Sequence, residues 1–169
     1  LLQLQFAPNP GEILAWMVRA GVESTVRAYG GDMRQGFAAT RDGPRTITRW
    51  TSGLRAAMNG AEGHANLFAA LRHAAFTGER GLLFVHAGVD PRRALDVQGD
   101  AFWWSPVDVL ALSAPFGGFA RVIRGFDRDR RGVVEGEFAV SVDAGAGRGG
   151  RLQAACFTIE GQIVDVCEA

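Results

Sequence analysis

The sequence predicts an α/β protein, in an α/β or α+β arrangement, with helices in the first half of the chain and a sheet in the second. The first half carries apolar residues at helical spacing, and the second carries short apolar runs of strand length. Hydrophobic residues make up 47% and charged residues 21% of the 169 positions, as in ordinary globular proteins. At this length one domain, spanning residues 1–169, is expected.

Two short helices are predicted first. Asn9 is a candidate N-cap, Pro10 suits the first helical position, and Glu12 adds an acid to the first turn. Gly21 is expected to end this helix. A second helix is expected over 22–29, where a pair of glycines follows.

The stretch 32–63 is expected to be an irregular or weakly helical insert, because glycines and arginines interrupt any sustained apolar period. Trp50, Leu54 and Met58 stand at helical spacing within it, and core packing is the favoured interpretation of this stripe. A clearer helix is predicted over 62–76. Its apolar stripe consists of Leu67, Phe68, Leu71 and Ala75.

The second half of the chain changes to strand-like runs. Residues 82–86 form an unbroken apolar run, which suits a strand buried on both faces. The other expected strands are 121–124, 138–143, 152–159 and 162–168. The last two are predicted to form a hairpin around Glu160 and Gly161.

Charge and composition exclude several classes of partner. All 18 positive charges are arginines and they balance 18 acidic residues, so no general attraction to nucleic acid or an anionic membrane is expected. No apolar run approaches the ~20 residues that span a bilayer and no signal peptide is recognised, which predicts a cytoplasmic protein.

The chain begins with Leu1 and not with methionine, as expected for a piece of a longer protein. Cys156 and Cys167 have no metal-site spacing and are expected to be small buried hydrophobes.

His86 is the first candidate for a functional role. It ends the predicted strand 82–86 and precedes a glycine loop, where open α/β sheets place their ligands. An imidazole binds a metal through either nitrogen. The alternative is a histidine whose nitrogens are satisfied by backbone carbonyls at the end of the strand.

The segment 85–91, Val-His-Ala-Gly-Val-Asp-Pro, resembles the His-Ala-Gly-Ile-x-Pro segment of calcineurin-like metallophosphoesterases. The branch in question holds phosphoprotein phosphatases and bacterial symmetrical dinucleoside-tetraphosphate hydrolases. Further segments agree with family elements in the same order, and the match covers most of the chain. These segments are 21–30, 63–71, 100–104, 123–126, 142–145 and 149–152.

The resemblance implies a four-layer α/β/β/α sandwich, here without its first strands, and a site for a phosphoric ester. His86 would be a metal ligand, and Asp90 or Arg124 would lie near the substrate. The cofactor would be a divalent metal, Mn, Fe or Zn, since family enzymes clamp the phosphoryl group between two metal ions. The partner would be a phosphorylated small molecule, a nucleotide or a phosphoprotein.

The chain also departs from the family pattern. Phe126 stands where the family has a metal-binding histidine, and the phosphate-binding arginine is replaced within 102–105. The aspartate-rich motifs that open the family domain are absent. His64 and His73 are nine residues apart on one predicted helix and therefore face opposite sides, so they share no metal. A degenerate metal centre is expected.

Two charged or glycine-rich segments allow a second interpretation. The five arginines of 121–131, offset by Asp127 and Asp129, suit a phosphate. A charged surface turn is the favoured interpretation. The string 145–150 matches G-x-G-x-x-G, but a strand and not a helix follows it, so a connecting loop is expected rather than a nucleotide site.

Three hypotheses about function follow. The first is a phosphoric ester hydrolase of the serine/threonine phosphatase or dinucleoside-tetraphosphatase type. The second is a catalytically inactive pseudoenzyme that binds a partner through the former active-site cleft of the family, or through Trp103 and Trp104. The third is a C-terminal portion whose activity depends on an upstream segment.

Overall fold

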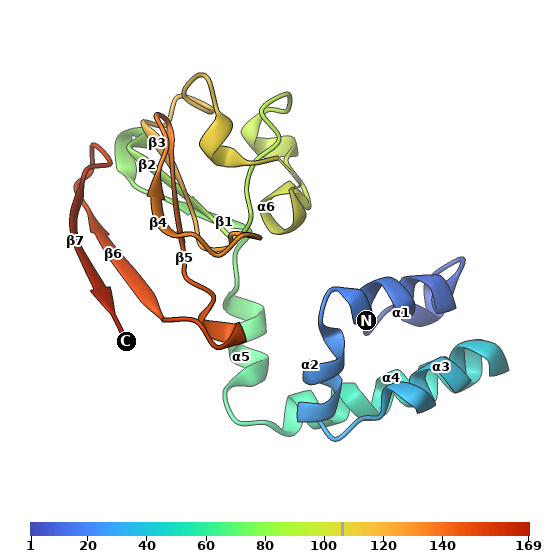
Figure 1. The fold of residues 1–169 in the computed structure, drawn as a ribbon. Helices are drawn as coiled ribbons and strands as arrows, with labels where there is room; N and C mark the ends of the chain where they lie inside the picture. Colours follow the sequence, from blue (N-terminus) through green and yellow to red (C-terminus); the bar gives the residue numbers. More distant parts are fainter. Residues whose placement is uncertain (106) are drawn as a thin grey trace. The chain divides into compact units, whose positions relative to one another are not determined.

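The computed structural model describes residues 1–105 and 107–169. The chain forms two compact units, Leu1–Leu71 (unit 1) and Arg72–Ala169 (unit 2), rather than the single domain expected from its length. Unit 1 is helical, and unit 2 holds every strand of the described residues (Figure 1). The helices-then-sheet order and the α/β class predicted from the sequence are confirmed.

Unit 1 packs its helices around an apolar core. Its elements are the 3-10 helix η1 (Leu4–Phe6) and the helices α1 (Pro10–Arg19), α2 (Val22–Ala28), α3 (Met33–Asp42), α4 (Pro44–Gly60) and α5 (His64–Ala70). Pro10 begins α1, and Gly21, with a φ of 95°, separates α1 from α2 as predicted. The buried core consists of Leu4, Leu14, Val26, Met33, Ala39, Ile47 and Leu54.

The stretch 32–63, expected to be irregular or weakly helical, is mostly regular helix and forms α3 and α4. The Asp32 side chain caps α3 by accepting a hydrogen bond from the Arg34 backbone N–H. Gly43, with a φ of 104°, lets the chain turn before Pro44 begins α4. The expected helix 62–76 is shorter than predicted: α5 ends at Ala70, and its apolar stripe is largely exposed.

Unit 2 is built on a mixed five-stranded sheet of order β1-β2-β3-β5-β4. Strands β2, β3 and β5 are parallel, and β1 and β4 pair antiparallel at the two edges. The strands are β1 (Ala74–Phe76), β2 (Leu82–Val85), β3 (Arg121–Arg124), β4 (Gly132–Glu135), β5 (Ala139–Asp143), β6 (Gln153–Phe157) and β7 (Ile163–Glu168). The short helices are η2 (Gly78–Arg80), η3 (Leu95–Val97), α6 (Ala101–Trp104), η4 (Val109–Ala111) and η5 (Ala146–Arg148).

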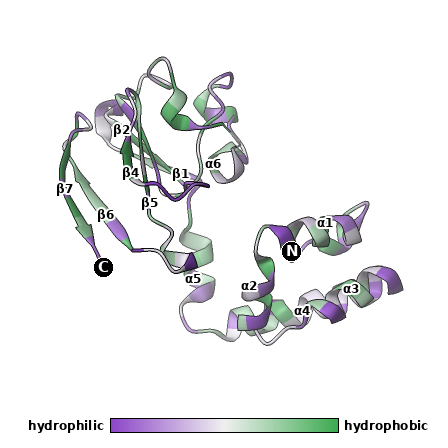
Figure 2. Cartoon of the chain, viewed as in Figure 1, coloured by the Kyte–Doolittle hydropathy of each residue, from purple (hydrophilic) through white to green (hydrophobic). Residues whose placement is uncertain are grey.

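The five-stranded sheet buries both faces. On one face, residues of the β2–β3 crossover pack against it, among them Phe102, Val109 and Phe119. The antiparallel hairpin β6–β7 covers the other face through Phe157 and Ile163 (Figures 1 and 2). The sequence predicted β2, β3, β5 and this hairpin, and it missed the short edge strands β1 and β4.

The hairpin also corrects the prediction for the two cysteines. Cys156 and Cys167 are free thiols and both are exposed, because only one face of the hairpin packs on the sheet. Among residues 1–105 and 107–169, no helix has both the length and the apolar character needed to cross a bilayer.

Candidate functional site

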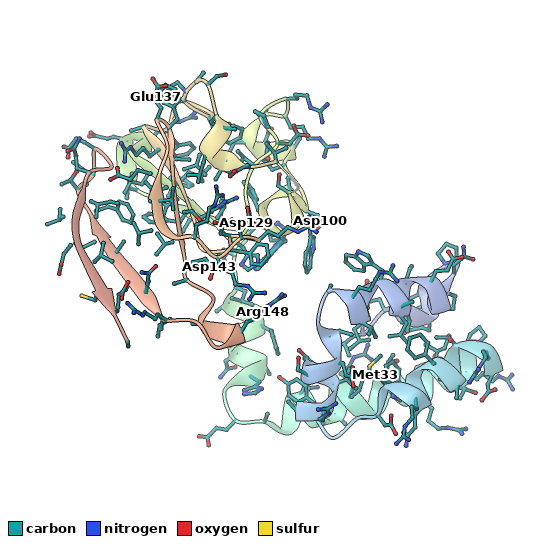
Figure 3. All side chains as sticks on the ribbon, in the orientation of Figure 1. Met33, Asp100, Asp129, Glu137, Asp143 and Arg148 are labelled. Atoms are coloured by element: carbon teal, nitrogen blue, oxygen red, sulfur yellow. The ribbon has the colours of Figure 1, made fainter. Side chains whose placement is uncertain are left out.

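The carboxyl ends of the three parallel strands bring several predicted site residues to one edge of the sheet. His86 directly follows β2, Phe126 follows β3, and Asp143 is the last residue of β5. Figure 3 labels Asp143 at this edge, together with Arg148 of the glycine-rich loop that follows β5. Open α/β sheets bind ligands at this position, so we call these strand ends the candidate site.

His86 lies between two aromatic side chains. Its imidazole stacks on the Phe126 ring at a centroid distance of 5.4 Å and an interplanar angle of 22°. The Trp103 ring lies 5.5 Å away on a tilted plane. The Phe126 backbone N–H donates to the His86 carbonyl oxygen at 2.8 Å, which fixes the two residues side by side. Phe126, which stands where the resemblance implies a metal-binding histidine, therefore packs on His86.

This setting favours the neutral imidazole. Burial lowers the pKa of His86, and the nearby Asp143 carboxylate partly opposes that effect. Among residues 1–105 and 107–169 no backbone carbonyl accepts a hydrogen bond from the imidazole, so this part of the chain gives the backbone-carbonyl alternative no support. A neutral ring with a free acceptor nitrogen suits a ligand or a weak base.

We expect replacement of Phe126 by alanine to raise the pKa of His86, because water regains access to the imidazolium. NMR titration of the imidazole C–H signals measures the shift, with His64→Ala and His73→Ala variants identifying the other two histidines. In the wild type the lowered pKa means that His86 is protonated at a lower pH in the folded protein than in the unfolded chain. This contribution therefore lowers stability as the pH falls below the unfolded value of about 6.5. An unchanged His86 pKa in Phe126→Ala would contradict the desolvating role of the ring.

Arg124 is buried in a network of charges. It ends β3 with only 5% of its surface exposed. Its Nη2 lies 2.9 Å from Asp127 Oδ1 and 3.1 Å from Asp108 Oδ1. Its Nε donates to Ser141 Oγ at 3.1 Å. With its donors engaged in this way, the guanidinium holds the end of β3 in place.

Asp127 is the centre of this network. Its carboxylate is 2% exposed and accepts hydrogen bonds from Arg124, from the Arg131 side chain and backbone, and from the Asp129 backbone N–H. Burial by itself raises the pKa of Asp127, but the hydrogen bonds from Arg131 and Asp129 and the charge of Arg124 together hold it below its ordinary value. Since Arg121 also pairs with Glu135, three of the five arginines of the predicted patch are ion-paired within the described part of the chain.

Asp90 organises its own loop. Its carboxylate accepts the Arg92 backbone N–H at 3.0 Å and pairs with the Arg92 and Arg93 side chains. The Arg92 backbone hydrogen bond is the main cause of its lowered pKa. Gln98, which is fully buried, accepts the Asp90 backbone N–H at 2.7 Å and donates to the Asp90 carbonyl. Sequence reasoning missed Gln98, because its partners are backbone groups of a non-repetitive loop.

The two remaining histidines contact aromatic side chains. His64 Nδ1 is 2.7 Å from Tyr29 Oη, and the residue is exposed. His73 lies beyond the end of α5 and makes an edge contact with Trp103 at 6.1 Å. No group of three or more His, Cys, Asp or Glu residues in the described part of the chain is placed to hold a metal ion.

A groove of about 530 Å³ adjoins the candidate site within unit 2. It lies between the five-stranded sheet and the β6–β7 hairpin, with an apolar floor that includes Phe84, Ile123 and Phe157. Asp143, Gly147 and Arg151 line its polar side. The two Asp143 oxygens accept the backbone N–H groups of Asp127 and Gly145, each at 2.8 Å, so that carboxylate is already engaged.

No family model matches this chain, no curated protein matches it, and no solved structure matches it. The function of the candidate site therefore has to be argued from its own residues.

Proposed function

We propose that this chain is a metallophosphoesterase-like domain with a degenerate metal centre, which binds a phosphate ester beside the strand ends without hydrolysing it. The observation that carries the proposal is the state of the three implied site residues. His86 stands between aromatic rings, Asp90 is bound to its own loop, and Arg124 is paired with buried carboxylates. Such residues keep the position of a phosphoesterase site but supply neither a two-metal clamp nor a free phosphate fork.

The groove is the part of this edge with room for a ligand. Its floor is apolar, and Arg151, at its polar side, is largely solvent-exposed and forms an ion pair with Glu168. A phosphate that replaces the Glu168 carboxylate at the Arg151 guanidinium loses little free energy, because exposed ion pairs contribute little to stability. The four-layer sandwich of the family belongs to this proposal as well, with the β6–β7 hairpin as the chain's contribution to the second sheet.

The test uses phenyl phosphate observed by ³¹P NMR, with Mn²⁺ added and bound metal determined by elemental analysis. We expect less than one metal ion per chain, no inorganic phosphate signal, and broadening of the ester signal on addition of protein. Stoichiometric metal together with release of phosphate would establish the hydrolase instead. Absence of broadening would overturn binding at this site.

A matched pair of arginine variants locates the ligand. Arg151→Gln is expected to weaken phenyl phosphate binding roughly tenfold or more, since a hydrogen bond to a charged group contributes about 1.5–3 kcal/mol. Arg148→Gln, three residues earlier in the same loop and outside the groove, is the control. Equal affinities of the two variants would exclude the groove as the site.

A further inference from the structure

A second cavity lies entirely within unit 1. It measures about 460 Å³ and sits between α3, α4 and the turn that follows α2. Volumes of this size accommodate small organic ligands. The lining residues are Tyr29, Gly30, Gly31, Gln35, Ala39, Thr46, Arg49, Trp50, Gly53 and Leu54.

Trp50 is the lining residue with an unmet hydrogen-bonding group. Its indole Nε1 is buried and has no hydrogen-bond partner. The ring is held by close packing on α3, because a Cβ at Gly36 would lie 2.6 Å from the Trp50 Cζ2 atom. A buried donor without a partner costs about 1–3 kcal/mol. The N–H is covered in this structure, so a ligand oxygen has to displace a flexible lining side chain to reach it and recover that free energy.

The charge of the cavity selects an anion. Arg49 is its charged lining residue, and no acidic side chain is among the residues that line it. Among the described residues Arg49 forms no ion pair, whereas Arg34 on the neighbouring helix is paired with Asp32. A guanidinium without a countercharge beside an apolar cavity is a receptor for a carboxylate.

The other walls define the body of the ligand. Tyr29, Ala39 and Leu54 contribute apolar surface next to the Trp50 ring. The Tyr29 hydroxyl is already engaged with His64 Nδ1 at 2.7 Å. Polar lining beyond Arg49 and the indole comes from Gln35 and Thr46, which are neutral. One cation and neutral walls match a single negative charge on an otherwise apolar molecule.

We propose that this cavity binds a small aromatic or aliphatic monocarboxylate, with the carboxylate at Arg49 and the indole N–H of Trp50, and the apolar body against Tyr29 and Leu54. This site is separate from the strand-end groove and does not depend on phosphate binding there. It gives unit 1 a ligand of its own.

The experiment titrates the full chain with cinnamate and follows the indole N–H signals by ¹H–¹⁵N NMR. The Trp50→Phe variant identifies the Trp50 signal among the four tryptophans. We expect a saturable downfield shift of this signal with cinnamate, as a new hydrogen bond to the indole requires, and none with the uncharged cinnamamide. An unmoved Trp50 signal at saturating cinnamate, or an equal shift with cinnamamide, would overturn the proposal.

Two arginine variants on one helix test the charge. Arg49→Gln is expected to raise the apparent Kd for cinnamate roughly tenfold or more. Arg45→Gln, four residues earlier on α4 and outside the cavity lining, is expected to bind as the wild type does. Retention of cinnamate affinity in Arg49→Gln would show that the carboxylate is not held there.

Discussion

Replacing Asp127 with asparagine is expected to lower the free energy of unfolding by roughly 3 kcal/mol, at the lower end of the 3–5 kcal/mol typical for loss of one partner of a buried ion pair. Asparagine keeps the shape of the side chain but removes the charge that faces Arg124 and Arg131. Arg124 is 5% exposed and cannot turn to water for compensation. Asp108, 3.1 Å from Arg124, remains as a second countercharge and limits the loss.

Chemical denaturation with urea, followed by circular dichroism, measures this difference. Asp129→Asn is the matched control, because Asp129 is exposed two residues along the same turn and contributes only its backbone N–H to the network. We expect the control to stay within about 0.5 kcal/mol of the wild type. A loss of similar size in both variants would mean that the turn as a whole, and not the buried carboxylate, determines stability.

The same substitution is expected to change how stability responds to acid. The lowered pKa of Asp127 means that the unfolded chain binds a proton at higher pH than the folded protein does. The stabilisation is therefore complete above the ordinary carboxyl pKa, about 3.9, and is lost as the pH falls toward the folded value. Asp127→Asn lacks this group, so its stability falls less steeply with acid than that of the wild type. Equal slopes for the two proteins below about pH 4 would contradict the role assigned to this carboxylate.

Local sequence signals predicted the centre of unit 2 well. The run that forms β2 is apolar at every position. Such a run indicates a strand buried on both faces, whichever strands pair with it in the sheet. The edge strands β1 and β4 carry weaker signals. The alanines of 74–76 continue the preceding helical pattern, and β4 begins at a glycine and covers only 132–135.

The stretch 32–63 was predicted as no more than irregular or weakly helical, because packing, rather than a sustained apolar period, holds its helices. Gly36 and Trp50 come from different helices, and their close approach depends on the absence of a side chain on α3. Helical stability in proteins comes mainly from such tertiary contacts. The spacing of apolar residues within one helix does not reveal that Gly36 of α3 leaves room for the Trp50 ring of α4.

The candidate site was predicted in position but not in chemistry. His86 lies at a strand end as expected, because a buried strand followed by glycine is a local pattern. The pairing of Arg124 with Asp108 joins residues 16 positions apart, across a stretch with no regular pattern between them. Whether an arginine is free for a phosphate or is held by carboxylates depends on such partners. The ion pairs with Asp108 and Asp127 therefore make Arg124 a structural residue, whatever position the resemblance implies for it.

Gly150→Ala is expected to lower the free energy of unfolding by roughly 1–3 kcal/mol, the usual cost of adding a methyl group where there is no space. A Cβ at position 150 would fall on the carbonyl oxygen of Ala144, which is backbone and cannot swing aside. The loop closes at this point through the Gly150 backbone N–H, which donates to the Gly145 carbonyl at 2.9 Å. Gly150 thus has a steric reason to be present that involves no nucleotide.

Gly147→Ala is the control for this substitution within the same loop. No atom lies within 4 Å of a Cβ at position 147, and its φ is not positive, so alanine is accommodated there. Thermal unfolding of the two variants, together with the NMR signals of β6, separates the explanations. A phosphate-binding loop would lose affinity for phenyl phosphate in both variants while keeping its stability. A connecting loop loses stability in Gly150→Ala alone, because only that methyl group pushes β5 and β6 apart where Ala144 bridges to Arg151.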